Sequence, residues 1–266
     1  MDGRWTAIVP SPSRDLGVLA WHLVTRLVPR APVVLAAAAL VAAGTVLVAG
    51  CSAQSDGAAD RDPGTSRHSA PVGVPTAVRG TGTLGSDFVD PEEPPAPEAT
   101  VNPAPGSWDD VAPPSGYRVV LLSPADPSTE TETLMDAVES WADAEDVTVV
   151  PVVADTVDER LSSVATAIAK RSDLVISVGD EMVDPIAAVS PSALHQQFLV
   201  LGAEIAEPTS NVTAADWTGA GFRGEGLGVS SHHDPSTFTD ERAGRALRAG
   251  VAATLNDLSG IVVWVP

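Results

Sequence analysis

The chain has 266 residues, with 35 Asp and Glu against 15 Lys and Arg, and a formal net charge of −20. This acidic balance argues against nucleic acid as a partner, because nucleic-acid-binding proteins usually present a basic surface. The single cysteine excludes an intramolecular disulfide and a zinc site built from several cysteines.

The first fifty residues combine a basic start with a long apolar run. Residues 31–50 are uncharged, Arg26 and Arg30 precede them, and Asp56 and Asp60 follow. Such asymmetry keeps the amino end in the cytoplasm and sends the downstream chain across the membrane. Twenty apolar residues are also enough to span a bilayer, so an uncleaved anchor is the alternative to a cleaved signal.

The cysteine stands directly after this run. The stretch Leu-Val-Ala-Gly-Cys at residues 47–51 resembles the lipobox of bacterial lipoproteins. The resemblance implies cleavage before Cys51, a diacylglyceryl group on its sulfur and acylation of the new amino end with a fatty acid such as palmitate. Two or three acyl chains anchor a protein firmly. We therefore expect a signal peptide over residues 1–50 and a lipid anchor at the extracytoplasmic face of a bacterial cell membrane.

The following segment has the composition of a linker. Residues 52–116 contain eleven Pro and eight Gly, and ten acidic residues against three basic ones. Such a sequence buries too little apolar surface to offset its conformational entropy. Residues 51–116 are therefore predicted to form a disordered acidic tether.

From Tyr117 the pattern changes to short apolar runs that alternate with helical periodicity. This alternation is typical of βαβ units around a parallel sheet. We therefore expect residues 117–266 to form a single doubly wound α/β lobe. The expected strands are 118–122, 147–153, 173–178, 197–202, 211–216 and 261–265. The expected helices are 128–144, one beginning near 156, one beginning near 180 and 239–257, with capping by Thr129 with Glu132 and by Thr156 with Glu159.

Three stretches of the lobe carry a family resemblance. They are the apolar run ending in Val-Gly at 173–179 with the turn at 180–184, the Phe-Thr-Asp-Glu-Arg-Ala-Gly segment opening 238–253, and the strand 260–265. Together they resemble the basic membrane protein family of substrate-binding lipoproteins, which have a two-lobed periplasmic-binding-protein-like fold. The chain is similar to the first lobe alone. The resemblance implies a small solute, a nucleoside in better-known members, and an ABC transporter permease as partner.

Ligands of open parallel sheets bind beyond the carboxyl ends of the strands. This rule selects Ser123, Asp126, Asp180 and Glu181 as candidate ligand-binding residues. Asp180 is equally well placed as a helix cap, as are Ser128 and Asp155, so capping is the alternative role. The solute-binding hypothesis expects Asp126 or Asp180 to face a cleft.

No cofactor, metal or enzymatic activity is predicted. The adjacent His232 and His233 suit a solvated loop better than a metal site, and no Gly-x-Ser-x-Gly motif is present. The alternative to solute binding is a lobe that acts as an interaction or scaffold module of the cell envelope. That alternative expects an exposed apolar patch, for instance around Trp217 and Trp264.

Overall fold

The structure is a computed structural model that describes residues 78–224 and 231–266. The chain divides between Thr65 and Ser66, and every described residue belongs to the second unit, Ser66–Pro266. Both clusters of buried apolar residues also lie in the second unit, so it has its own core and is the unit used in the experiments below. The predicted signal segment, Cys51 and the first part of the predicted tether lie outside the described residues.

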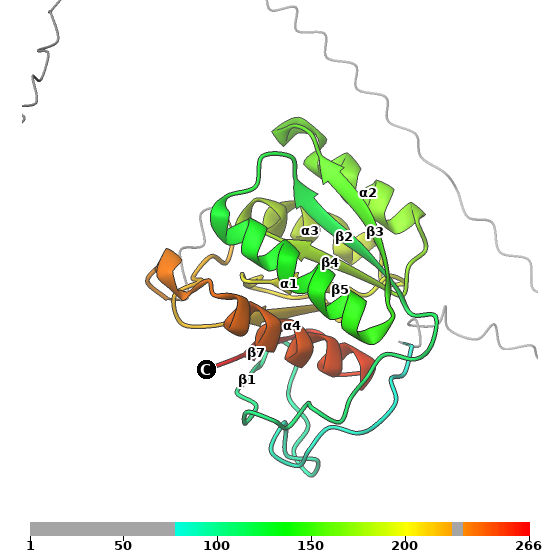
Figure 1. Ribbon diagram of the computed structural model, residues 1–266, viewed down its shortest axis with the longest axis vertical. Helices are drawn as coiled ribbons and strands as arrows, with labels where there is room; N and C mark the ends of the chain where they lie inside the picture. Colours follow the sequence, from blue (N-terminus) through cyan, green and yellow to red (C-terminus); the bar gives the residue numbers. More distant parts are fainter. Residues whose placement is uncertain (1–77, 225–230) are drawn as a thin grey trace, which may run out of the picture. The chain divides into compact units, whose positions relative to one another are not determined.

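One parallel sheet organises the described part of the chain. Its seven strands lie in the order β1-β7-β6-β5-β4-β2-β3, which confirms the predicted α/β class (Figure 1). The central strands are buried on both faces, as expected of apolar β-branched runs in a parallel sheet. The strands are β1 (Thr100–Val101), β2 (Arg118–Pro124), β3 (Thr148–Ala154), β4 (Leu174–Val178), β5 (Phe198–Leu201), β6 (Val212–Asp216) and β7 (Ile261–Trp264).

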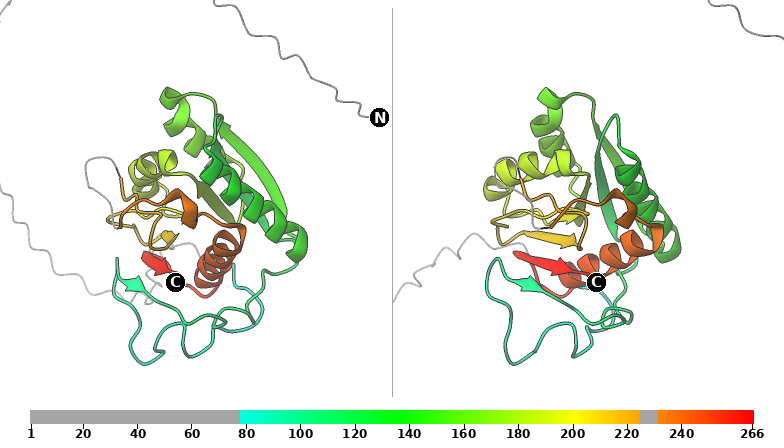
Figure 2. Two further views of the ribbon diagram at one scale, coloured as in Figure 1. Left: turned by 60° about the vertical axis from the view of Figure 1, so that its left-hand side comes forward. Right: turned by 90° about the vertical axis from the view of Figure 1, so that its left-hand side faces the viewer.

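Helices cover both faces of the sheet (Figures 1 and 2). The helices α1 (Thr129–Glu145) and α4 (Asp240–Leu255) pack on one face, and α2 (Arg160–Ala169) and α3 (Val183–Val189) on the other. Short 3-10 turns lie at Val157–Glu159, Asp180–Met182, Ser190–Ser192 and Pro235–Thr237. Among the described residues, no helix is both long and apolar enough to cross a membrane.

Two predicted helix starts differ in detail. Ser128, and not Thr129, is the N-cap of α1, and its Oγ accepts a hydrogen bond of 3.2 Å from the Thr131 amide. Thr156 precedes a 3-10 turn without a capping hydrogen bond from its side chain, so α2 begins only at Arg160. The periodicity located both helices, but the exact first residue depends on which hydroxyl reaches a free amide.

The predicted boundary at residue 117 is wrong, because residues 78–116 pack against the sheet. We call these residues the strap. Its β1 pairs with β7, with Val101 opposite Val263, and its Phe88 and Trp108 are only 2% and 3% exposed. The two rings meet edge to face with centroids 6.4 Å apart. Composition averaged over the segment predicted disorder, whereas a few large apolar side chains supply the burial that orders it.

Helix α4 approaches the sheet closely at Gly250. A Cβ atom at this position would lie 2.6 Å from Leu199 Cδ1 and 3.0 Å from Ala215 Cβ. Gly244, on the same helix, has open space, with Arg248 Nη1 as the nearest atom at 3.8 Å. The contact at Gly250 therefore fixes how deeply α4 sits over β5 and β6.

At one edge of the sheet, β3 is protected against the addition of another strand. The Thr148 amide donates to Tyr117 O at 3.0 Å, and Ala154 O accepts from the Ala125 amide at 3.0 Å. Because backbone groups of a strand alternate in direction, Pro151 lies at a position facing away from β2. A proline there leaves no amide for an incoming strand to pair with.

Candidate functional site

Two glycines end adjacent strands at the carboxyl edge of the sheet. Gly179 directly follows β4 with φ +88°, and Gly202 directly follows β5 with φ +75°. A Cβ atom at Gly179 would lie 2.7 Å from Glu181 Oε2, and one at Gly202 would lie 2.7 Å from Leu134 Cδ1. Glycine is required at both positions, for the left-handed backbone and for the close approach of α1 and Glu181.

A pocket of about 210 Å³ opens over these two glycines. One wall is the first turn of α1, and the second is the turn after β4. The third wall is formed by the loop that follows β6 and by the segment that precedes α4. The lining residues are Ser128, Glu130, Thr131, Leu134, Gly179, Asp180, Glu181, Gly202, Ala220, His233 and Phe238.

Glu181 gives the pocket its main chemical feature. Its Oε2 atom is buried and, within the described part of the chain, has no hydrogen-bond partner. Burial raises the pKa of the Glu181 carboxyl, and a hydrogen bond from its own backbone lowers it. The Asp180 side chain raises it through a hydrogen bond and through its charge, while Arg160 lowers it. A carboxylate oxygen removed from water without a donor costs free energy, so this atom is poised to accept a hydrogen bond from a ligand.

The wall formed by α1 adds hydroxyl groups. Ser128 Oγ lies 3.2 Å from Thr131 Oγ1, and the same Oγ caps the Thr131 amide. The cap satisfies one of the free amides at the start of the helix. The wall therefore offers neutral hydroxyls that can donate or accept.

The third wall is aromatic. The Phe238 ring lies between Trp217, with centroids 5.0 Å apart, and His233, with centroids 5.8 Å apart. His233 Nδ1 is 2.9 Å from Ala220 O, and because a carbonyl only accepts, Nδ1 carries the proton. In the neutral ring, Nε2 is then an acceptor.

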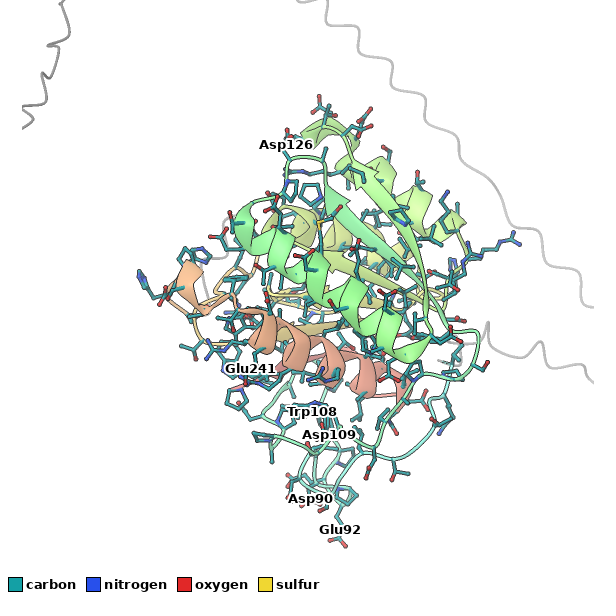
Figure 3. All side chains as sticks on the ribbon, viewed as in Figure 1. Asp90, Glu92, Trp108, Asp109, Asp126 and Glu241 are labelled. Atoms are coloured by element: carbon teal, nitrogen blue, oxygen red, sulfur yellow. The ribbon has the colours of Figure 1, made fainter. Side chains whose placement is uncertain are left out.

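The structure brings two of the four candidate residues into the pocket. Asp180 and Glu181 line it, whereas Ser123 is 2% exposed inside β2 and Asp126 lies at the exposed turn before α1 (Figure 3). Ser123 and Asp126 do not line the pocket, because β2 continues to Pro124 and the Ala125 amide donates to Ala154 O of β3. That bond draws the chain after β2 toward β3, away from β4 and β5.

Other residues of the pocket escaped the sequence analysis. Glu130, Thr131, His233 and Phe238 reach it only because α1 and the chain before α4 fold over the ends of β4 and β5. The one signal available was that residues 128–131 open a predicted helix directly after a predicted strand, which places them at the carboxyl edge.

The apolar patch expected around two tryptophans is not formed. Trp217 is 1% exposed and Trp264 is half-buried. The large apolar side chains that the described part of the chain does expose are Val78, Val153, Val157, Leu161 and Leu194. Within the described ranges no group of three or more His, Cys, Asp or Glu side chains is arranged to hold a metal ion.

No protein-family model and no curated protein matches the chain, so the resemblance to the basic membrane protein family stays a prediction. Solved structures with similar folds include an ABC transporter solute-binding protein from Aeropyrum pernix K1, at 19% identity and a TM-score of 0.36 over 39% of this chain. A fragment described as a lipoprotein from Peptoclostridium difficile 630 has 16% identity and a TM-score of 0.39 over 53% of this chain. A LacI-family regulator, CCPA from Weissella paramesenteroides with bound sucrose, has 9% identity and a TM-score of 0.31 over 55%.

The lengths covered differ among these structures. The chain spans 29% of the solute-binding protein, 98% of the lipoprotein fragment and 57% of the regulator. At these identities and TM-scores the likenesses carry no argument about a ligand. The α/β assignment rests on the parallel sheet itself.

Proposed function

We propose that the unit Ser66–Pro266 is a solute-binding lobe that holds a small primary amine in the pocket over Gly179 and Gly202. The observation that carries the proposal is Glu181 Oε2, a buried carboxylate oxygen without a hydrogen-bond partner in the described chain, at the edge of a parallel sheet where ligands bind. A protonated amine supplies both the missing donor and the compensating charge.

The size of the pocket limits the solute. Its volume is about 210 Å³. Drug-sized ligands fill larger pockets. The solute is therefore expected to be a compact amine, of the size of ethanolamine or putrescine.

The ionisable side chains of the pocket determine which charge the solute should carry. They are the carboxyls of Glu130, Asp180 and Glu181 and the imidazole of His233. His233 Nδ1 donates its hydrogen to Ala220 O, so this nitrogen has no free hydrogen to offer a solute. The lining contains three acidic side chains and no Lys or Arg, so the pocket favours a cationic solute over an anionic one.

The remaining parts of the proposal concern location and partners. The lipobox-like residues before Cys51 support a lipid anchor, and an acidic segment between anchor and lobe supports display outside the membrane. The resemblance of the lobe to substrate-binding lipoproteins supports transfer of the solute to an ABC transporter permease. No catalytic role is proposed.

Thermal unfolding tests whether the unit binds a compact amine. We expect ethanolamine, putrescine or another compact amine at millimolar concentration to raise the unfolding midpoint of the unit, because a ligand at a hundred times its Kd adds about 2.7 kcal/mol to stability. The Glu181→Gln variant should lose this shift, because its amide offers no negative charge to the ammonium group. The matched control Glu132→Gln, on the exposed side of α1, should keep it. A panel of amines that leaves the midpoint unchanged would refute the proposal.

The raised pKa of Glu181 predicts how stability depends on pH. Because burial favours the protonated carboxyl in the folded state, the unfolded chain releases its proton first as pH rises. Stability from this group is complete below the ordinary glutamate pKa and is lost as pH rises through the raised one. We expect Glu181→Gln to stabilise the unit above that raised pKa and to have little effect at more acidic pH. Urea unfolding at several pH values measures this difference.

A separate test addresses the anchor. In a bacterial host fed with a clickable palmitate analogue, we expect the full chain to become labelled and to sediment with membranes. Cys51→Ser should abolish the label, because the serine hydroxyl does not replace the thiol in lipid attachment. Equal labelling of the two chains would exclude Cys51 as the attachment site.

A further inference from the structure

The outer part of β3 lacks a covering helix on the α1 side of the sheet. On the α2 side, Val152 and Ala154 are 7% and 3% exposed. On the α1 side, Val153 is 46% exposed, Pro151 is exposed and Val149 is only half-buried. The two faces of the same strand therefore differ, and the difference marks an unpartnered sheet face beside α1.

This face forms a groove with an apolar floor and an acidic rim. Its volume is about 300 Å³, and its floor consists of Leu121 from β2, Ala142 from α1, and Val147, Val149 and Pro151 at and before β3. The rim consists of Glu139 and Asp143, on the side of α1. We call this feature the α1–β3 groove.

The shape of the groove favours a helix as the occupant. The layer on this face of the sheet already contains α1 and α4, which pack against each other (Figure 1). Pro151 disfavours an added strand at this edge, because it removes one of the outward-facing amides with which such a strand would pair. A helix laid beside α1 would continue the layer and bury the apolar face of β3.

The charge of α1 defines the surface of that helix. Glu139 and Asp143 are four residues apart on the same helix face, and in the described chain neither makes an ion pair or a side-chain hydrogen bond. Like charges at this spacing repel, and acidic residues near the carboxyl end of a helix oppose its dipole. The last turn of α1 contains no basic residue, and Glu145 and Asp146 add further negative charge. Basic side chains of a partner would relieve this repulsion.

We propose that the α1–β3 groove docks an amphipathic helix of a partner protein, whose apolar face packs on Val147, Val149 and Pro151 and whose Lys or Arg side chains pair with Glu139 and Asp143. This inference does not depend on the solute pocket, which lies at the carboxyl edge of β4 and β5. It gives the two carboxyl groups on the rim, Glu139 and Asp143, a role in binding a partner.

The test uses a short synthetic helix with Leu on one face and Lys on the other, and a counterpart in which Glu replaces Lys. We expect the Leu/Lys helix to bind the unit and Glu139→Lys/Asp143→Lys to weaken binding about tenfold, as for paired charges at an interface. The control Asp90→Lys/Glu92→Lys makes the same change in net charge on the strap, far from α1 (Figure 3), and should retain the affinity. The Leu/Glu helix should not bind.

Two further measurements keep the proposal falsifiable. The Glu139→Lys/Asp143→Lys variant should also show a higher unfolding midpoint, since the substitution removes repulsion at the end of α1. Val149→Ser, which keeps all charges, should weaken binding as well, because it removes apolar area from the floor. Absence of binding, equal weakening by the control on the strap, or unchanged affinity of Val149→Ser would overturn the proposal.

Discussion

Replacing Trp108 by alanine should lower the free energy of unfolding of the unit by about 3–5 kcal/mol, the usual cost of truncating a large buried aromatic side chain. Trp108 is 3% exposed, its ring meets Phe88, and it belongs to the same apolar cluster as α1 and α4. Urea unfolding followed by circular dichroism measures the loss. The result would establish the strap as part of the core, although its composition is that of a linker.

A neighbouring residue provides the control. Asp110 is exposed on the same segment, so Asp110→Ala should change stability by less than about 0.5 kcal/mol. A chain that begins at Tyr117 should lose cooperative unfolding altogether, because it lacks β1, Phe88 and Trp108. Equal effects of the Trp108 and Asp110 substitutions would show that the strap does not stabilise the sheet.

Two glycines of α4 should respond to alanine in opposite directions. Alanine is more favourable than glycine inside a helix by about 1 kcal/mol. A Cβ atom at Gly244 would meet no atom closer than 3.8 Å, so Gly244→Ala should stabilise the unit by about that amount. Gly250→Ala gains the same propensity but places a Cβ 2.6 Å from Leu199 Cδ1 and 3.0 Å from Ala215 Cβ. Overpacking of this kind costs about 1–3 kcal/mol, so we expect net destabilisation.

Thermal and urea unfolding measure the free energy of unfolding of each variant. In the difference between the two values the gain in helix propensity cancels, because both variants make the same Gly to Ala change within α4. That difference reports the close approach of α4 to β5 and β6 alone. If Gly250→Ala were as stabilising as Gly244→Ala, the helix would have to lie further from the sheet than the geometry shows.

The sequence was sufficient to predict the strands and helices after Tyr117, because their signals are local. Apolar β-branched runs such as residues 118–122 and 173–178 indicated buried parallel strands, and Leu247 and Val251 recur at helical spacing on α4. The order of strands in the sheet follows from pairing between distant segments and is read from the structure.

The strap could not be predicted because its order depends on contacts far away in the sequence. Thr100 and Val101 form a strand only by pairing with Val262 and Val263 at the other end of the chain. Similarly, Phe88 and Trp108 are buried by the apolar cluster that α4 helps to build. Pro and Gly content reports the flexibility of an isolated segment and not what a neighbouring sheet can order.

Only part of the pocket could be predicted from the sequence, because its other residues reach it through contacts between distant segments. The rule about carboxyl ends of strands led directly to Asp180 and Glu181, which follow β4 without an intervening loop. His233 and Phe238 come from a loop whose path is fixed by tertiary contacts, including the hydrogen bond from His233 to Ala220. That Asp126 lies outside the pocket could not be foreseen, because the pairing of Ala125 with Ala154 is a long-range contact.

The proposal that the pocket binds a compact amine is tested most directly by nuclear magnetic resonance. The ¹⁵N-labelled unit Ser66–Pro266 would be titrated with ethanolamine and with putrescine at constant pH and ionic strength. The account predicts saturable shifts of the Gly179 and Gly202 amides, which line the pocket, while Gly116, which has no atom near its Cβ position, stays unchanged. Amide shifts confined to other parts of the lobe, or none with any amine, would contradict it.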